Sequence, residues 1–160
     1  MKKTTLAFLV LPMLAGALAA ATFKAHAQQA PKPEQLIKWR QSAYQVLAWN
    51  NGRIKAVVDG TYNREEAVKA ANAIAAIANA GLGSLFAPGS ETGKGWHDTT
   101  AKPTLWTEGA KAGELAGNFT REANELAKVA QHGDQAALKE QFGKLGKTCK
   151  GCHDEFRVAN

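Results

Sequence analysis

The sequence contains little cysteine and little methionine, and these shortages already restrict the class of protein. Among its 160 residues are 2 Cys and 2 Met. Two cysteines are too few for a disulfide-dense scaffold, so a packed core has to provide the stability. The 45% hydrophobic and 21% charged residues are ordinary for a globular protein and exclude collagen-like, mucin-like and disordered chains. The length allows one domain, or one domain with a tail.

Long uncharged apolar runs are also scarce, and the longest lies near the beginning of the sequence. Two lysines precede an uncharged Leu- and Ala-rich stretch at 6–23, and small residues follow at 25–27. This pattern predicts a cleaved secretory signal peptide at 1–27 and export of residues 28–160 to the periplasm. The alternative is a retained membrane anchor, but proline and glycine interrupt the 18-residue stretch.

Removal of this segment changes the charge and leaves no methionine. Residues 1–27 contain three lysines and no acidic residue, so their removal lowers the formal charge from +6 to +3. We therefore expect neither nucleic acid nor a membrane as a partner. Met1 and Met13 also leave, so residues 28–160 contain no methionine.

Proline and glycine divide the remaining chain into four predicted helices. They run from about Pro33 to Val58, from Asn63 to about Ala78, from near Pro103 to Gly133, and from Asp134 to about Arg157. A glycine-rich loop from Gly81 to Lys102 separates the second helix from the third, and we expect it to cover a pocket. No segment shows sustained strand alternation. The fold class is therefore predicted to be all-α, an antiparallel four-helix bundle.

The last helix has the clearest periodicity. Residues spaced 4, 3, 4, 3 and 4 apart form a heptad seam: Leu138, Phe142, Leu145, Cys149, Cys152 and Phe156. The seam predicts that both cysteines face the interior of the bundle.

Residues 149–153 read Cys-Lys-Gly-Cys-His, the C-x-x-C-H sequence to which haem c is attached. Cys149 and Cys152 share one helix face, so their thiols can bond the two vinyl groups of one porphyrin. His153 then supplies an imidazole to the iron. A redox dithiol, a structural disulfide and a zinc site are the alternatives. We predict one covalent haem c near the C-terminal end of the bundle.

The missing methionine restricts which side chain can bind the iron at its second axial position. Most electron-carrying c cytochromes use a methionine sulfur there, which residues 28–160 cannot provide. We expect His97 and His132 to be surface residues, so His153 is predicted to be the only axial ligand. A pentacoordinate, high-spin haem has an open position for a diatomic gas.

The sequence resembles the cytochrome c′ family, and the resemblance covers nearly all of residues 28–160. It is carried by C-K-G-C-H at the end of the last helix, with weaker matches at 38–42 (K-W-R-Q-S), 85–89 (L-F-A-P-G) and 101–106 (A-K-P-T-L-W). The family is commonly dimeric, which implies a homodimer. The Ala-rich second helix and apolar parts of the first are the expected contact surfaces.

The resemblance also implies roles for individual residues. Arg40 and Gln41 correspond to residues near the haem propionates, and Phe86 to an aromatic residue packed on the haem. Tyr44 corresponds to the distal residue over the open face of the iron. Arg157 corresponds to a basic residue that flanks the proximal pocket.

The expected function is binding of nitric oxide or carbon monoxide, in nitric oxide binding or protection, without catalysis. The alternative is a periplasmic electron carrier that serves redox partner proteins. A thiol-disulfide oxidoreductase is disfavoured by the haem motif. A peroxidase is disfavoured because the sequence offers no clear distal His/Arg pair.

Overall fold

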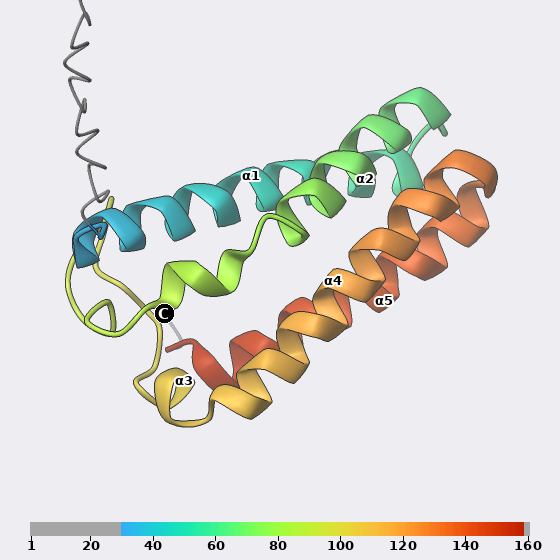
Figure 1. Cartoon of the computed structure of the whole chain (residues 1–160). Coiled ribbons are helices and arrows are strands. Elements are labelled where there is room, and N and C mark those ends of the chain that lie inside the picture. Colours follow the sequence, from blue (N-terminus) through green and yellow to red (C-terminus); the bar gives the residue numbers. More distant parts are fainter. Residues whose placement is uncertain (1–29, 159–160) are drawn as a thin grey trace, which may run out of the picture. The chain divides into compact units, whose positions relative to one another are not determined.

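The structure of the protein is a computed structural model that describes residues 30–158. The predicted signal peptide at 1–27 lies outside the described residues. The helical elements are α1 (Pro33–Asp59), α2 (Arg64–Ala78), the 3-10 turn η1 (Leu82–Phe86), α3 (Thr104–Thr107), α4 (Gly109–His132) and α5 (Gln135–Phe156). The four long helices form the predicted all-α bundle, with α1 beside α2 and α4 beside α5 (Figure 1).

Side-chain caps explain where α2 and α5 begin. The side chain of Asn63 accepts a hydrogen bond from the backbone N–H of Glu66 at 3.1 Å. Asp134 does the same for the N–H of Ala137 at 2.8 Å. Each cap satisfies one backbone donor that has no partner inside the helix, which stabilises the helix start. Both predicted starts are confirmed.

The third predicted helix is wrong at its beginning. It was expected near Pro103, but Glu108 leaves the helical conformation with φ −108° and ψ 42°, and α4 starts at Gly109. The preceding residues form the single turn α3. Its position is fixed by tertiary contacts, since the backbone N–H of Lys102 donates to the carbonyl of Phe156 at 2.8 Å. Periodicity within the sequence does not reveal such a contact.

The main hydrophobic cluster runs along the bundle and reaches Leu145, one helical turn before Cys149. Its fully enclosed side chains include Ile54, Ile74, Leu126, Leu138 and Leu145. The alanines of α2 belong to the same cluster: Ala67, Ala70, Ala71 and Ala78 are all buried. These small residues let α2 pack closely against both α1 and α4. The alanine face is therefore used inside the bundle, and α2 does not offer it to a second subunit as was expected.

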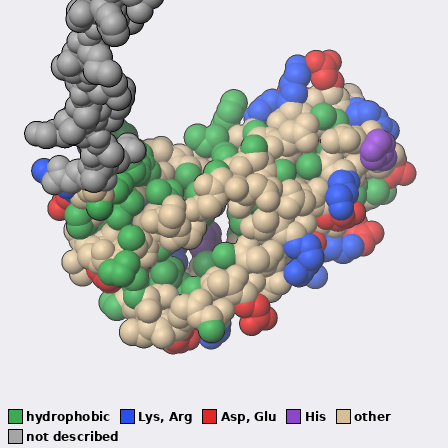
Figure 2. Space-filling model, in the orientation of Figure 1, with side chains coloured by type: hydrophobic (Ala, Val, Ile, Leu, Met, Phe, Trp, Pro, Cys, Tyr) green, Lys and Arg blue, Asp and Glu red, His purple; other side chains and the backbone are tan. Residues whose placement is uncertain are grey.

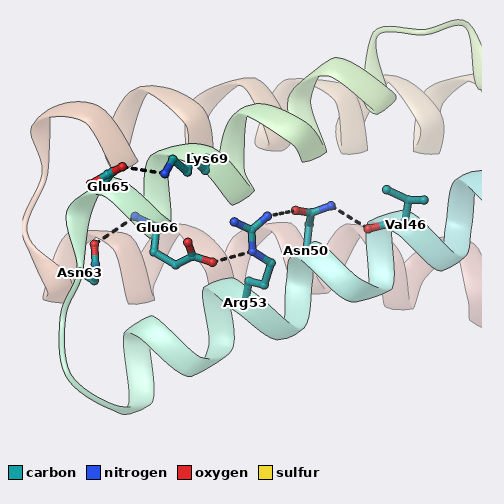
Figure 3. A network of polar contacts seen from close by, with 7 residues as sticks. All are labelled: Val46, Asn50, Arg53, Asn63, Glu65, Glu66 and Lys69. Carbon is teal, nitrogen blue, oxygen red and sulfur yellow. Dashed lines mark hydrogen bonds and ion pairs between the residues drawn. The ribbon is translucent and has the colours of Figure 1, made fainter.

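A polar network joins α1 to α2 at the edge of this core (Figure 3). Asn50 is fully buried and donates from its amide to the carbonyl of Val46 at 2.9 Å. Arg53 donates to the Asn50 amide oxygen at 2.8 Å and to the Glu66 carboxylate at 2.6 Å. The buried amide therefore has partners for both its donor and its acceptor, as a polar group in a core requires.

No helix within residues 30–158 is both long enough and apolar enough to cross a membrane.

Candidate cofactor site

The two cysteines lie one helical turn apart near the end of α5. Both are partly buried and neither is in a disulfide. Burial raises the pKa of the Cys149 and Cys152 thiols. Redox-active dithiols and zinc-binding thiols depend on a lowered pKa, so this environment does not favour either alternative. Nor do residues 30–158 contain a cluster of three or more His, Cys, Asp and Glu side chains that could hold a metal ion.

His153 follows directly and lies at the surface of α5. Its pKa is lowered, first by partial burial and then by the positive charge of Arg157. The guanidinium of Arg157 lies 3.5 Å from Nδ1 of His153, one turn along the chain. A lowered pKa keeps the imidazole neutral, and the neutral imidazole is the form that binds a metal. Arg157 is thus placed beside His153, where the resemblance expected it.

Tyr44 of α1 faces the cysteine region of α5. Burial raises its pKa to about 12, and interaction with Cys152 and Cys149 contributes in the same direction. The phenol therefore stays protonated at neutral pH. Even so, 41% of the residue is open to solvent. The side of the protein drawn in Figure 2 has a hollow, with histidine atoms visible inside it.

Three aromatic rings from three elements follow one another at this end of the bundle. The ring centroid of Phe86, on η1, lies 6.4 Å from that of Tyr44 and 6.1 Å from that of Trp106, on α3. These are ordinary distances for tilted and edge-to-face aromatic pairs. Phe86 therefore connects α1 to α3. The sequence did not predict a role for Trp106, although residues 101–106 are one of the segments that resemble the family.

Arg40 fastens the glycine-rich loop to α1. It is only 4% exposed and donates to the Leu85 carbonyl, to the hydroxyl and carbonyl of Ser90, and to the Thr99 hydroxyl, over 2.6–3.2 Å. Its guanidinium carbon also lies 4.9 Å from the Phe86 ring centroid. All four acceptors are neutral, and within residues 30–158 Arg40 forms no ion pair. Burial lowers its pKa, although arginine stays charged.

Gln41 holds the same loop from the neighbouring position. Its side-chain carbonyl accepts a hydrogen bond from the backbone N–H of Trp96 at 2.7 Å. Its side-chain amide donates to the backbone carbonyl of His97 at 2.9 Å. Gly95 permits this approach, because a Cβ there would lie 2.8 Å from the backbone nitrogen of Lys38. The structure thus places Gln41 against the loop.

The other two histidines are exposed, as predicted. His97 has its Nδ1 2.8 Å from the Asp98 carbonyl oxygen, within the loop. His132 ends α4, next to the start of α5. It is separated from His153 by most of the length of α5, on the order of 27 Å at 1.5 Å per residue. His132 therefore cannot bind the same metal ion as His153.

Two open depressions, of about 420 and 370 Å³, lie elsewhere on the protein. The first is lined by residues 58, 134–136 and 139, and the second by residues of α4 and the start of α5. Neither is lined by a cysteine, phenylalanine, tyrosine or tryptophan. The chemistry-bearing side chains are gathered at the other end of the bundle.

The residues of the candidate site fit a haem group. Two thiols one turn apart can bond one edge of the porphyrin, and the neighbouring neutral imidazole can bind its iron. Aromatic rings are present to pack on an apolar macrocycle, and the buried charge of Arg40 has no carboxylate partner among residues 30–158. In addition, the indole nitrogen of Trp106 is enclosed and has no acceptor within that range. The fold and site together define a c-type haem protein.

Comparison with known proteins also indicates a c-type haem protein, and it identifies the family. Residues 35–157 match the model of the family described as Cytochrome C'. A cytochrome c′ of Rhodocyclus tenuis is 65% identical over 127 residues, covering 79% of this chain and 96% of the relative. A solved cytochrome c′ described as having a ligand-controlled dimer dissociation is 41% identical, with a TM-score of 0.78, covering 81% of this chain and 98% of that one. A nitric oxide complex of a variant cytochrome c′ from Alcaligenes xylosoxidans is 30% identical, with a TM-score of 0.71, covering 80% and 98%.

The chain therefore belongs to the cytochrome c′ family. Proteins of this family carry one covalently bound haem c, which confirms the cofactor expected from the C-x-x-C-H sequence.

Proposed function

We propose that this protein is a periplasmic, non-catalytic binder of nitric oxide or carbon monoxide. When bound, the haem supplies an iron with a coordination position for a diatomic gas. The observation that supports the proposal is the lack of an evident second iron ligand among residues 30–158. They contain no methionine, His132 is far from His153, and Nδ1 of His97 lies 2.8 Å from the Asp98 carbonyl oxygen within the loop. The leader pattern at 1–27 supports export.

Tyr44 controls access to the open position under this proposal. Tyr44 is on α1 and lies near the two cysteines of α5. Its phenol remains a hydrogen-bond donor because its pKa is raised to about 12. Bulk would slow the entry of a gas, whereas a hydrogen bond would retain a polar ligand. These effects can be separated, since phenylalanine keeps the ring and removes the hydroxyl.

The test is carbon monoxide binding to the reduced haem protein by rapid mixing. Tyr44→Ala should bind faster than the wild type by at least about tenfold, because a barrier of 1.4 kcal/mol corresponds to that factor. Tyr44→Phe should retain the slow rate if bulk dominates. Tyr62→Ala is the matched control, since Tyr62 is the other tyrosine and contacts the Gly133 carbonyl. An unchanged rate in Tyr44→Ala contradicts the role of Tyr44.

The electronic state of the haem separates gas binding from the alternative of electron transfer. A gas binder should give high-spin EPR and optical spectra that change when nitric oxide is added. A low-spin haem that does not respond would overturn gas binding and favour an electron carrier that serves redox partner proteins, because two fixed ligands suit electron transfer.

We further propose a homodimer that pairs through α1. This helix leaves Trp39, Val46 and Trp49 on one face, at 46%, 43% and 63% exposure. Their spacing of seven and three residues places them in one stripe. Such an apolar stripe on a helix marks an association surface. Because Tyr44 lies on the same helix, a ligand that displaces it can alter the contact.

Sedimentation tests both parts of this proposal. The wild type should sediment as a dimer, and Trp49→Lys should sediment as a monomer. Ala116→Lys, an exposed position of α4, should leave the dimer intact. Carbon monoxide should lower the mass of the wild type if the ligand and the contact are linked. A wild-type monomer contradicts the dimer, and an unchanged mass with carbon monoxide contradicts the link.

A further inference from the structure

Trp106 differs from the other three tryptophans of the structure. Trp39, Trp49 and Trp96 are 46%, 63% and 60% exposed, and the indole N–H of Trp96 donates to the Ser42 hydroxyl at 2.9 Å. The indole nitrogen of Trp106 is enclosed, yet no residue within 30–158 accepts its hydrogen. An enclosed donor without an acceptor costs free energy on the order of 1–3 kcal/mol. A hydrogen-bond acceptor beside this nitrogen would stabilise the protein, and residues 30–158 do not provide one.

The surroundings of the indole indicate the charge of that acceptor. The guanidinium carbon of Arg40 lies 5.8 Å from the Trp106 ring centroid. Arg40 is buried, its four hydrogen bonds go to neutral oxygens, and it forms no ion pair within the described residues, although the Glu91 carboxylate interacts with its charge from a greater distance. A buried cation without an ion pair creates a positive potential in a medium of low polarity. An anionic oxygen is therefore the favoured acceptor beside the indole.

The position of Trp106 ties it to the haem-bearing helix. The residues before α3 are fastened to the end of α5, with the Lys102 N–H bonded to the Phe156 carbonyl and the Lys102 ammonium 3.0 Å from the Asp154 carbonyl. The Phe86 ring, edge-on at 6.1 Å, fixes the indole from the other side. Trp106 is thus held at the same end of the bundle as Cys149, Cys152 and His153.

We propose that Trp106 is a positioning residue for the cofactor: its indole N–H donates a hydrogen bond to a carboxylate of the haem. The two propionates are the anionic groups that haem brings to this end of the bundle. Arg40 contributes through its charge, which favours an anion near the indole, while its Nη1 and Nη2 atoms are bonded to the loop. This assignment goes beyond gas binding and stands whichever gas, or none, is bound.

The experiment compares ferric, haem-loaded wild type with Trp106→Phe, which keeps the ring and removes the donor. The propionate bending band in the resonance Raman spectrum should move to lower frequency in Trp106→Phe. It should also lose the small shift that deuterium oxide causes in the wild type. Trp96→Phe is the matched control, since it removes a bonded indole N–H outside the site, and it should change neither observation.

A propionate band that is unchanged in Trp106→Phe overturns the proposal, as does an equal change in Trp96→Phe. A merely structural role would alter thermal stability without moving this band. If Trp106→Phe fails to accumulate, nitrogen-15 labelling of the wild-type tryptophans gives the same answer. The Trp106 indole proton should exchange slowly and should show a shift caused by the paramagnetic haem. An exchange rate equal to those of the exposed tryptophans, or a shift that follows added phosphate, overturns the assignment.

Discussion

The two ends of the bundle are built differently. In the half that contains Ile54, Ile74 and Leu138, aliphatic side chains fill the interior and are completely enclosed. In the other half, Leu36 and Ile37 are also buried, but the interior further contains Arg40, aromatic rings and two partly buried thiols. The first half can be stable with its own side chains. The second half is arranged around a group that the chain does not supply, and the following three experiments test this division.

The largest effect is expected from removal of both cysteines. Cys149→Ala combined with Cys152→Ala should abolish covalent haem attachment, because no other thiol exists in the sequence. Intact-mass spectrometry under denaturing conditions measures this directly. Each single variant should keep one thioether bond and therefore retain the haem mass. Haem that stays attached in the double variant would contradict the assignment of the site.

The second effect concerns stability in the aliphatic half. Ile54→Ala should lower the free energy of unfolding by about 2–5 kcal/mol, since it leaves a cavity at a fully buried position. The haem absorption spectrum should stay the same, because Ile54 contacts none of the site. Urea unfolding followed by circular dichroism measures the first quantity and absorption the second. A spectrum that changes as much as the stability would mean that the two halves are not independent.

The smallest effect is expected at the polar edge between α1 and α2. The hydrogen bond and charge of Arg53 lower the pKa of the Glu66 carboxylate. Since the folded pKa lies below the unfolded one, the pair stabilises the protein above the ordinary pKa of glutamate. This contribution disappears as the pH falls from the ordinary pKa of glutamate through the lowered pKa of the folded state.

Glu66→Gln should therefore be slightly less stable than the wild type at pH 7, and the difference should vanish in acid. The measurement is urea unfolding at several pH values, and the difference should also shrink in high salt because the pair is exposed. Glu65→Gln is a suitable control, since Glu65 pairs only with the exposed Lys69. A difference that grows in acid would contradict the sign of the pKa shift.

The sequence was sufficient for features that depend on neighbours along one helix. The caps at Asn63 and Asp134 and the seam of α5 follow from local spacing, and all three are present. The C-x-x-C-H segment is local as well, and it predicted the cofactor. By contrast, the residues that lead into α3 are held by the contact of Lys102 with Phe156, 54 positions further along the chain. No pattern within one helix contains that information.

The candidate site shows the same limit. The resemblance placed Arg40 near the propionates but could not show that its donors are used by Leu85, Ser90 and Thr99. This follows from the folding of the glycine-rich loop onto α1. Trp106 was also missed, since an unpartnered indole nitrogen can be recognised only after the surrounding atoms are placed. A tryptophan next to a glycine-rich loop is the signal that could have drawn attention to it.

The end of the chain closes this site, which has a consequence for the order of assembly. Val158 donates its N–H to the Thr100 carbonyl, and the Phe156 carbonyl accepts from Lys102. The loop and α3 cannot take these positions until residues 156–158 have been made and brought back across more than 50 residues of chain. The aliphatic half is likewise closed by distant residues, since the side chain of Gln135 donates to the carbonyls of Val57 and Val58. The contacts that close the haem site therefore belong to the non-local class, which is slow to form during folding.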